Sequence, residues 1–419
     1  MLDIKFIREN PGLVQKAAKD KKIDIDITHL LEIDKKRLEL QKSVQTLQEE
    51  RNMFTKGISG KPTDEQVEKG KKIKEKLEIQ EHALNAVKAE LDIWLLKVPN
   101  IPKPDVKVGE NESGNEVIRK YKEPTKFTFT PKDHLELGVK LGLIDTESAA
   151  KVSGTRFAYL KNDAVLLEFA LVQFAFDFLI KEGFIPILPP VLIKREIMQG
   201  LGYMENGGEE DMFATKDNLF LVGTAEQSLV PMHKDEVFQI KDLSRRYVGY
   251  STSFRREAGS YGKDTRGILR VHQFNKVEMV SFVPQGEDDQ EHEYLLSLEE
   301  KMFQALNIPY QVVKMCTGDL GFPAARKYDI EAWMPGQEKY REVTSVSTTT
   351  DFQSRRLNIK YQDGQDKKFV NILNGTAFAL SRTPVAILEN YQQEDGSIVV
   401  PEVLRKYMGK DRITPQNRV

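Results

Sequence analysis

The chain has 419 residues, of which 62 are Lys or Arg and 64 are Asp or Glu, and its formal net charge is −2. At roughly 150 residues per domain, this length predicts two or three domains. A hydrophobic share of 40% and a charged share of 30% exclude a disordered chain. The single cysteine, Cys316, excludes an intramolecular disulfide and a cysteine-cluster metal site.

The sequence favours a cytosolic protein over a secreted or membrane-bound one. The first ten residues carry Asp3 and Glu9, where a secretory signal would have basic and then apolar residues. The most apolar stretch, residues 166–180, includes Glu168 and Asp177 and is too short and too polar to cross a bilayer. Because the net charge is close to zero, any contact with nucleic acid has to come from local basic patches.

Hydrophobic residues recur every seven positions in the first hundred residues. One series runs over residues 30–54 and another over 73–98, and the glycines and proline of GISGKP at 57–62 separate them. Two helices of about 30 residues, each roughly 45 Å long, predict an antiparallel coiled-coil hairpin over residues 27–98. Two seam positions hold arginine, Arg37 and Arg51, in place of an apolar residue.

Two basic clusters lie on the predicted hairpin, at different levels along it. By charge alone, a solvated helix surface is favoured over a nucleic-acid contact, and both interpretations stay open. The clusters are Lys35, Lys36 and Arg37 on the first helix, and Lys69, Lys71, Lys72, Lys74 and Lys76 on the second.

Residues 99–117 contain three prolines and two glycines and predict a linker. We therefore expect an N-terminal domain over 1–103 and a second domain over 104–419. Successive strands with few helices between them predict an α+β domain, in which helices flank an antiparallel sheet. Strands are expected at 184–190, 219–223, 245–256, 268–283, 328–334 and 369–375, and helices at 164–181, 292–306 and 384–393.

Several common site signatures are absent from the sequence. The six histidines form no HxxxH or HExxH pair, and one cysteine cannot complete a zinc site. Neither GxxxxGK[ST] nor a strand followed by GxGxxG occurs. A nucleotide would therefore have to bind without either of the usual glycine-rich phosphate loops.

One segment, residues 252–280, combines groups that suit a nucleotide. Its Arg-Arg-Glu run can pair with phosphate, and an aromatic residue beyond a glycine-containing loop can stack on a base. Taken alone, this pattern leaves a surface hairpin with an Arg–Glu pair as an equal alternative. The residues concerned are Arg255, Arg256, Glu257, Gly259, Gly262, Gly267, Phe274 and Glu278.

In full, FRREAGSYGKDTRGILRVHQFNKVEM closely resembles motif 2 of class II aminoacyl-tRNA synthetases, and in particular that of the seryl-tRNA synthetase family. Four further segments resemble that family in the expected order, so the resemblance covers nearly the whole chain. They are GFIPILPPVL at 183–192 (motif 1), LVGTAEQSL at 221–229 (serine-binding loop), REVTSVSTTTDFQSRR at 341–356 (metal- and ATP-contacting strand) and NILNGTAFALSRTPVAILEN at 371–390 (motif 3).

The resemblance implies roles in ATP binding. Arg255 would hold the α-phosphate and the substrate carboxylate, Glu257 would contact the adenine, and Phe274 would stack beneath the base. Arg382 would meet the γ-phosphate, so Arg255, Glu257 and Arg382 are the implied catalytic residues. The implied ATP-binding residues are Arg255, Arg256, Glu257, Val271, Phe274, Glu342, Val343, Thr344, Ser345 and Arg382.

It also implies the remaining ligands. Glu342 and Ser345 would coordinate Mg²⁺, and the basic clusters of the hairpin would bind tRNA. The family's motif 1 forms a homodimer interface, and no zinc is expected. The implied serine-binding residues are Thr224, Ala225, Glu226, Arg255, Glu278 and Thr376.

The function implied is activation of serine by ATP to seryl-adenylate and transfer of the seryl group to the 3′ end of tRNA(Ser), with its long variable arm. Whether tRNA(Sec) is a second acceptor stays open. Two alternatives are a paralogue that loads an amino acid onto a carrier protein and a non-catalytic tRNA-binding homologue. Residues 344–348 and the loop YMENGGEED at 203–211 depart from the family pattern.

Overall fold

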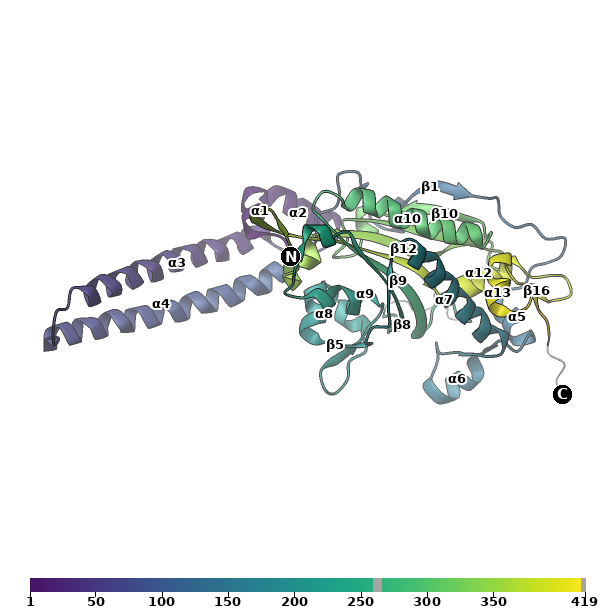
Figure 1. The fold of residues 1–419 in the computed structure, drawn as a ribbon, viewed down its shortest axis with the longest axis horizontal. Coiled ribbons are helices and arrows are strands. Elements are labelled where there is room, and N and C mark those ends of the chain that lie inside the picture. Colours follow the sequence, from purple (N-terminus) through teal and green to yellow (C-terminus); the bar gives the residue numbers. More distant parts are fainter. Residues whose placement is uncertain (259–265, 416–419) are drawn as a thin grey trace. The chain divides into compact units, whose positions relative to one another are not determined.

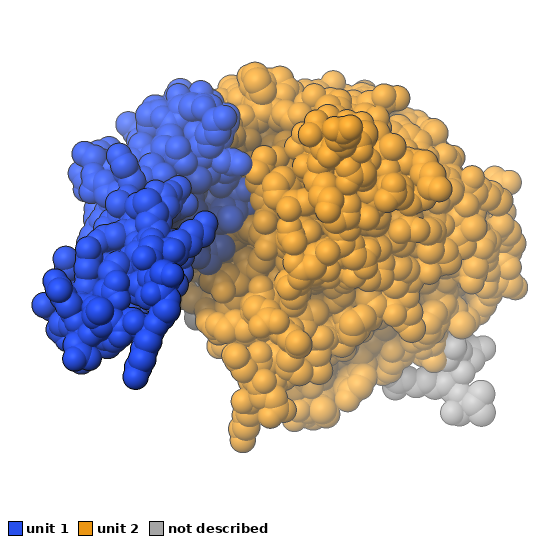
Figure 2. Space-filling model, turned by 60° about the vertical axis from the view of Figure 1, so that its left-hand side comes forward, with its two compact units in different colours: residues 1–99 blue, residues 100–419 orange. Residues whose placement is uncertain are grey.

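The computed structural model describes residues 1–258 and 266–415, and the chain forms two compact units. The first comprises residues 1–99 and the second residues 100–419, coloured blue and orange in Figure 2. Within the described ranges, no helix is long and apolar enough to span a membrane. Gly259 and Gly262 of the predicted motif 2 loop lie outside these ranges.

The first unit is helical, and its two longest helices run antiparallel over about 30 residues (Figure 1). Side-chain caps fix where both helices begin: the Asp26 carboxylate accepts from the N–H groups of Thr28 and His29, and Thr63 forms a capping box with Gln66. The predicted hairpin is confirmed. The helices are α1 Ile4–Glu9, α2 Pro11–Asp20, α3 Ile27–Lys56 and α4 Asp64–Leu96.

The predicted seam is the buried side of the α3–α4 pair. It includes Leu30, Ile33 and Val44 of α3 and Ile73, Leu77, Leu84, Val87 and Leu91 of α4. The arginine at position 37 is accommodated by Asp34, whose side chain is only 1% exposed. Arg37 Nη2 lies 2.8 Å from one Asp34 oxygen and Arg8 Nε of α1 lies 2.9 Å from the other, so two cations balance one buried carboxylate.

The second unit is built on an eight-stranded sheet of order β1-β10-β11-β12-β15-β9-β8-β4, in which only the β4–β8 pair is parallel. The predicted α+β class is confirmed. The strands are β1 Glu116–Tyr121, β4 Ile185–Ile187, β8 Arg245–Phe254, β9 Gln273–Val283, β10 Tyr310–Lys314, β11 Arg326–Met334, β12 Lys339–Thr350 and β15 Asn371–Ala379.

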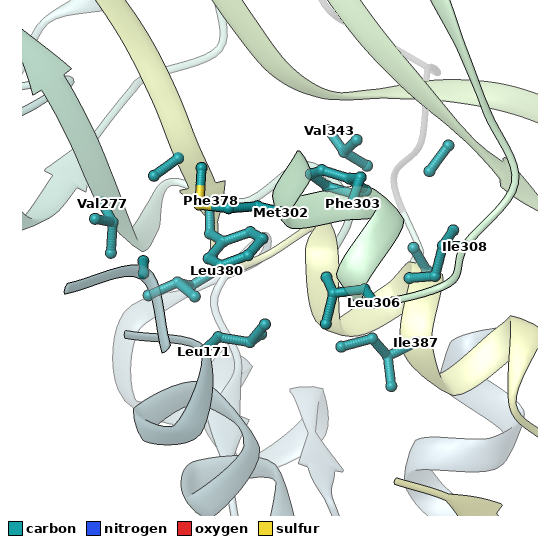
Figure 3. Packing of buried hydrophobic residues seen from close by; sticks show 14 of the residues in the cluster. Leu171, Val277, Met302, Phe303, Leu306, Ile308, Val343, Phe378, Leu380 and Ile387 are labelled. Atoms are coloured by element: carbon teal, nitrogen blue, oxygen red, sulfur yellow. The ribbon is translucent and has the colours of Figure 1, made fainter. Parts of the chain in front are cut away.

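Two long and two short helices bury the main core against the sheet (Figure 3). Leu171 of α7 and Phe303 of α10 belong to the same buried cluster as Val277 of β9 and Phe378 of β15. The rings of Phe303 and Phe378 lie 5.9 Å apart between centroids, which suits tilted aromatic packing. The helices are α7 Asp163–Lys181, α10 Asp288–Ala305, α12 Thr383–Asn390 and α13 Glu402–Met408.

Shorter elements complete the second unit. The strands β5 and β6 pair beside the sheet, and β7, β13 and β14 form a small sheet of their own. Their bounds are β2 Ile144–Asp145, β3 Tyr159–Leu160, β5 Leu192–Lys194, β6 Leu219–Leu221, β7 Val237–Gln239, β13 Lys360–Asp363, β14 Asp366–Phe369, β16 Ile398–Val399 and β17 Arg412–Ile413, with helices α5 His134–Lys140, α6 Thr146–Ser153, α8 Arg195–Leu201, α9 Glu226–Leu229 and α11 Phe352–Leu357.

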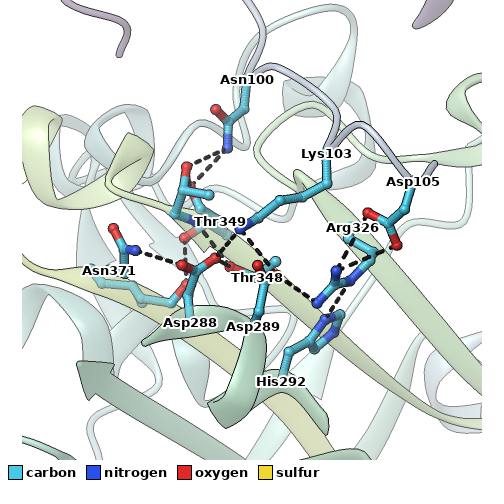
Figure 4. A network of polar contacts seen from close by, with 12 residues as sticks. Asn100, Lys103, Asp105, Asp288, Asp289, His292, Arg326, Thr348, Thr349 and Asn371 are labelled. Atoms are coloured by element: carbon cyan, nitrogen blue, oxygen red, sulfur yellow. Dashed lines mark hydrogen bonds and ion pairs between the residues drawn. The ribbon is translucent and has the colours of Figure 1, made fainter. Parts of the chain in front are cut away.

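The segment that begins at Asn100 is the start of the second unit, and polar contacts fix it to the rest of that unit (Figure 4). The Asn100 amide donates to the carbonyl oxygen of Thr349 at 2.7 Å, and Lys103 Nζ lies 2.7 Å from Asp288. Asp105 lies 3.4 Å from Arg326. This part of the predicted linker is therefore held in place rather than extended in solvent.

Within this network, His292 is fully buried and held neutral. Arg326 Nε donates to its Nδ1 at 3.1 Å, so Nε2 carries the proton and faces the carbonyl oxygen of Val346 at 3.1 Å. Burial, reinforced by the charge of Arg326, lowers the pKa of His292 to about 3 from its ordinary value of 6.5. Between about pH 6.5 and pH 3, His292 is therefore mostly protonated in the unfolded chain and mostly neutral in the folded chain.

We expect the free energy of unfolding to fall on acidification, by about 2 kcal/mol between pH 7.5 and pH 5 from this group alone. Denaturant titrations at the two pH values measure it. His292→Gln should be less stable at pH 7.5 but should lose this part of the pH dependence, whereas His82→Gln, exposed on α4, should keep it. An undiminished pH dependence in His292→Gln would contradict the assignment.

Candidate active site

A pocket of about 390 Å³ lies on the sheet of the second unit, over strands β8, β9, β12 and β15. Alternation along β9 explains its position. Phe274, Lys276 and Glu278 line the pocket, while Val277 and Met279, which follow Lys276 and Glu278 directly, belong to the main core. Since successive side chains of a strand point to opposite faces, the same strand supplies polar groups to the pocket and apolar groups to the core.

Arg255 lies just beyond the end of β8, where it faces the pocket. Its Nε and Nη2 donate to the carbonyl oxygen of Gly223 at 3.3 and 3.2 Å, and its guanidinium lies 5.3 Å from the ring centroid of Phe274. These contacts hold a cation beside an aromatic face. Among the described residues these hydrogen bonds use two of its five N–H donors, which leaves three for an anion.

A second cation lies in the same pocket. Arg382, at the start of α12, pairs with the Glu342 carboxylate of β12 at 3.0 Å and donates to the Glu342 carbonyl oxygen at 3.2 Å. Burial opposes ionisation of Glu342, but Arg382, Lys327 and Arg255 together lower the pKa of this carboxyl to about 2. Glu342 is therefore an anion at neutral pH, among three cations.

Glu257 lines the pocket in a strained backbone conformation. Its φ of 53° lies in the left-handed region, which costs a residue with a side chain about 1 kcal/mol or more. The Glu257 carboxylate pairs with Arg270, also a pocket residue. This pair holds the Glu257 side chain against the pocket wall.

At the other end of the pocket, carboxylates and donors gather around Glu226, which is 2% exposed. The Tyr203 hydroxyl lies 2.9 and 2.8 Å from the two Glu226 oxygens, and Gln353 Nε2 donates to Oε1 at 2.9 Å. Burial raises the pKa of Glu226, and the nearby charge of Glu278 raises it further, against the lowering effect of the Gln353 and Tyr203 hydrogen bonds.

Glu278 has partners of its own in this corner. It forms an ion pair with Lys276 two positions earlier on β9. Thr376 of β15 is the cross-strand partner of Glu278, and its Oγ1 lies 3.5 Å from the Glu278 carboxylate. Lys276 Nζ lies 3.4 Å from Thr224 Oγ1. The corner thus offers hydroxyls, carboxylates and one ammonium group to a small polar ligand.

Most residues predicted for the site line this one pocket, although they come from segments spread over 150 positions. Ala225 and Arg256 are not among its lining residues as the described ranges form it. Ala225 is fully buried in a neighbouring core cluster, and the Arg256 guanidinium lies over Phe213 at 5.9 Å. Those that line the pocket are Thr224, Glu226, Arg255, Glu257, Val271, Phe274, Glu278, Glu342, Val343, Thr344, Ser345, Thr376 and Arg382.

The sequence analysis missed Tyr203, Gln353, Lys276 and Lys327. Gln353 lay within the recognised segment 341–356, but nothing in a sequence tells that its amide would meet Glu226. Tyr203 lay in the loop noted as a departure from the family pattern. The other departure, at 344–348, is accommodated by partners on α10: Thr344 donates to Glu299 at 2.6 Å.

The donor set at Glu342 and Ser345 suits a hard cation. Both line the pocket and offer oxygen ligands. Over residues 1–258 and 266–415, no group of three or more His, Cys, Asp and Glu side chains is arranged to hold a metal. Mg²⁺ is usually held by one or two protein carboxylates together with substrate phosphates, so two protein oxygens fit such an ion.

The basic residues of the two clusters in the first unit differ in exposure and in internal contacts. The five clustered lysines of α4, within residues 69–76, are exposed, with Lys72 and Lys74 3.7 Å from glutamates one turn away and Lys69 over the Phe54 ring at 5.4 Å. Lys35 and Lys36 are exposed as well. Arg37 is instead held by Asp34 and by Gln41 at 2.9 Å, which makes it a structural residue.

Comparison with known proteins agrees with this fold and pocket. Residues 211–391, which include six of the eight strands of the sheet and most of the pocket, match the family model of the tRNA synthetase class II core domain (G, H, P, S and T), which defines the class as class II aminoacyl-tRNA synthetases. Residues 1–102 match the model of the seryl-tRNA synthetase N-terminal domain.

Full-length relatives narrow the assignment. A serine–tRNA ligase of Dictyoglomus thermophilum is 46% identical over 99% of this chain and 100% of its own. The crystal structure of seryl-tRNA synthetase from Pyrococcus horikoshii complexed with ATP is 41% identical, with a TM-score of 0.93 over 100% of both chains. A cytoplasmic serine–tRNA ligase of Naegleria fowleri in complex with AMP is 32% identical, with a TM-score of 0.89 over 100% and 99%.

The chain belongs to the seryl-tRNA synthetase family. The family predicted from the motifs is thus confirmed, and with it the class of activity, that of an aminoacyl-tRNA ligase.

Proposed function

We propose that the chain is a serine–tRNA ligase whose pocket forms seryl-adenylate from serine and ATP and then passes the seryl group to the 3′ end of tRNA(Ser). The observation that carries this proposal is the polarity of the pocket. Arg255 offers a cation beside the aromatic face of Phe274, Arg382 offers a second cation beside Glu342, and Glu226 and Glu278 offer carboxylates in the same pocket.

The chemistry of activation fits this arrangement. A serine carboxylate oxygen attacks the α-phosphorus of ATP, and the bond from that phosphorus to the bridging oxygen breaks, releasing diphosphate. The reaction brings several anionic oxygens together, so fixed cations and correct positioning lower its barrier. Arg255 would hold the α-phosphate and the serine carboxylate, Arg382 the γ-phosphate, and Phe274 the adenine, with Glu257 at its edge. No side-chain nucleophile is required.

The polar side chains around Glu226 would select serine over less polar amino acids. Glu226 and Glu278 would receive the ammonium group, and Thr224 and Thr376 supply hydroxyls near it. A site that hydrogen-bonds a substrate hydroxyl discriminates strongly against an analogue without one, because its buried polar groups are then left unpaired. Selection of serine over alanine would rest on this penalty.

Glu342 and Ser345 would hold Mg²⁺ together with the phosphates of ATP. When bound, this ion neutralises phosphate charge. The anionic state of Glu342, maintained by the surrounding cations, leaves its oxygens available as ligands at neutral pH.

ATP–pyrophosphate exchange with each of the twenty amino acids tests the proposal. Serine alone should support rapid exchange, and charging assays should show transfer to tRNA(Ser); tRNA(Sec) belongs in the same assay as a second acceptor. Exchange with serine and transfer only to a carrier protein would favour the carrier-loading paralogue. Binding of tRNA without any exchange would favour the non-catalytic homologue.

We expect a symmetric homodimer through motif 1, because apolar side chains are exposed there. Within motif 1, Leu188 is 80% exposed and Ile185 45%, and Phe169, 60% exposed, lies on α7, which contacts β4. Sedimentation at micromolar concentration should give about twice the chain mass of 47.9 kDa. Leu188→Asp should shift the equilibrium toward the single chain, whereas Ile79→Asp, 66% exposed on α4, should not. An active unmodified protein that sediments as a single chain would contradict the proposal.

A further inference from the structure

The segment from Tyr203 to Asp211 crosses the pocket from the serine end to the nucleotide end. It follows α8 through Gly202, whose φ of 85° suits glycine. Its first residue contacts Glu226, and Glu205 pairs at 2.7 Å with Arg356, whose side chain is 1% exposed. A Cβ at Gly208 would lie 2.0 Å from the Tyr203 carbonyl oxygen, so the turn requires glycine.

At its far end, the segment is bound to motif 2. The Asp211 carbonyl oxygen accepts from the Arg256 N–H at 2.9 Å, and the Asp211 carboxylate accepts from the Ala258 N–H at 2.9 Å. The backbone that carries Arg255 and Glu257 is therefore tied to the backbone that carries Tyr203. The segment that begins at Tyr203 is therefore held at both of its ends.

The contacts at Glu226 are unequal between its two oxygens. The single Tyr203 proton is shared between Oε1 and Oε2, and Oε1 also accepts from Gln353, which donates to the Leu201 carbonyl oxygen as well. Among the hydrogen bonds of the described residues, Oε2 therefore has only the shared one. Since a carboxylate oxygen accepts about two hydrogen bonds, Oε2 retains the larger capacity for a donor in the pocket.

We propose that Tyr203 is a positioning residue for the amino acid: by holding both oxygens of Glu226, its hydroxyl orients this carboxylate so that Oε2 receives the substrate ammonium group. The proposal deepens the proposed function and rests on it, because it takes Glu226 as the group that binds the serine amino group. Tyr203 acts through Glu226 and need not touch the reacting atoms.

The ionisation of both partners supports this role. Burial and the charge of Glu226 raise the pKa of Tyr203 well above its ordinary value, so the hydroxyl keeps its proton. The charged and titratable groups that act on the pair are Lys276, Glu278 and Arg255. Hydrogen bonds from Tyr203 and Gln353 favour the ionised form of Glu226 against burial. Only the ionised form can pair with an ammonium group.

Tyr203→Phe removes the hydroxyl and keeps the ring. We expect the KM for serine in ATP–pyrophosphate exchange to rise about 10- to 100-fold, the effect of losing a hydrogen bond to a charged group. The KM for ATP should stay within about threefold, since no nucleotide contact changes. Inhibition of exchange by 3-hydroxypropanoate, which is serine without its amino group, should be unaltered.

The pH profile gives an independent readout. Without the Tyr203 hydrogen bond, the pKa of Glu226 rises further, so the acid limb of kcat/KM for serine should move to higher pH in Tyr203→Phe. The matched control is Tyr391→Phe, which deletes a hydroxyl that donates to the Leu306 carbonyl oxygen at 2.6 Å. It should leave both the serine KM and the acid limb unchanged.

The outcomes separate the two proposals. If the unmodified protein gives no serine-dependent exchange, the proposed function is overturned and this inference with it. If the unmodified protein is active but Tyr203→Phe shows an unchanged serine KM and acid limb, the inference alone is overturned. An equal loss of affinity for serine and 3-hydroxypropanoate would also overturn it, because the hydroxyl would then not act through the amino group.

Discussion

Arg255→Ala is expected to lower serine-dependent ATP–pyrophosphate exchange by about 10³-fold while the protein stays folded. The substitution removes a guanidinium that lies in the pocket beside Phe274 and that donates, among the described residues, to one backbone carbonyl, that of Gly223. Because the guanidinium makes few internal contacts, its loss should destabilise the anionic transition state and leave the stability of the fold nearly unchanged.

The neighbouring residue offers a matched comparison. Arg256→Ala deletes the same charge one position along, but the Arg256 guanidinium lies over Phe213 and does not line the described pocket. We expect a loss at least tenfold smaller than that of Arg255→Ala. Circular dichroism and thermal unfolding establish that both variants fold. Near-normal exchange in Arg255→Ala would remove this residue from the mechanism.

Removing the coiled-coil hairpin should separate the two steps of the reaction. We expect a variant with residues 38–88 replaced by a short glycine-rich turn to keep serine activation and to lose tRNA charging by at least about 100-fold. All proposed adenylate-forming residues lie in the second unit. A helix pair of about 45 Å suits contact with a distant part of tRNA, and family resemblance points to the long variable arm.

The cut is placed so that the base of the hairpin survives. Asp34 and its partners Arg8 and Arg37 remain, as do the buried residues Leu30 and Leu91. The finer variant replaces the five clustered lysines of α4, those within residues 69–76, with glutamine, which should raise the KM for tRNA and flatten its salt dependence without changing exchange. Wild-type charging by the shortened protein, or loss of its serine activation, would contradict this role.

The sequence predicted regular elements well where a repeating pattern met a clear stop. The heptad seam and the GISGKP break predicted α3 and α4, and runs rich in β-forming residues predicted β8, β9 and β11. It did not predict β1, whose residues are exposed or half-buried and carry no apolar alternation, because this strand lies at the sheet edge. Edge pairing is decided by the neighbouring strand, β10, rather than by local sequence.

The site was predicted residue by residue only through the family motifs. From charge and spacing alone, the Arg-Arg-Glu run of motif 2 could equally be part of a nucleotide site or of a surface hairpin. They could not tell that Arg255 faces the pocket and Arg256 does not, since this depends on how the chain turns at the end of β8. The contact of Tyr203 with Glu226 joins a loop to a helix that begins 23 residues later, and only the folded chain reveals it.

The strict alternation along β9 also limits how this enzyme can change over time. Inserting or deleting one residue would turn Lys276 and Glu278 toward the core and Val277 toward the ligand, so a single indel would damage stability and activity together. The partner strand β15 already contains its one irregularity, a bulge between Thr376 and Phe378 that keeps the first facing Glu278 and the second facing Val277. A substitution on one face of β9 can therefore be tolerated without changing the other face. An insertion or deletion changes both faces at once, so the length of this strand pair should rarely change.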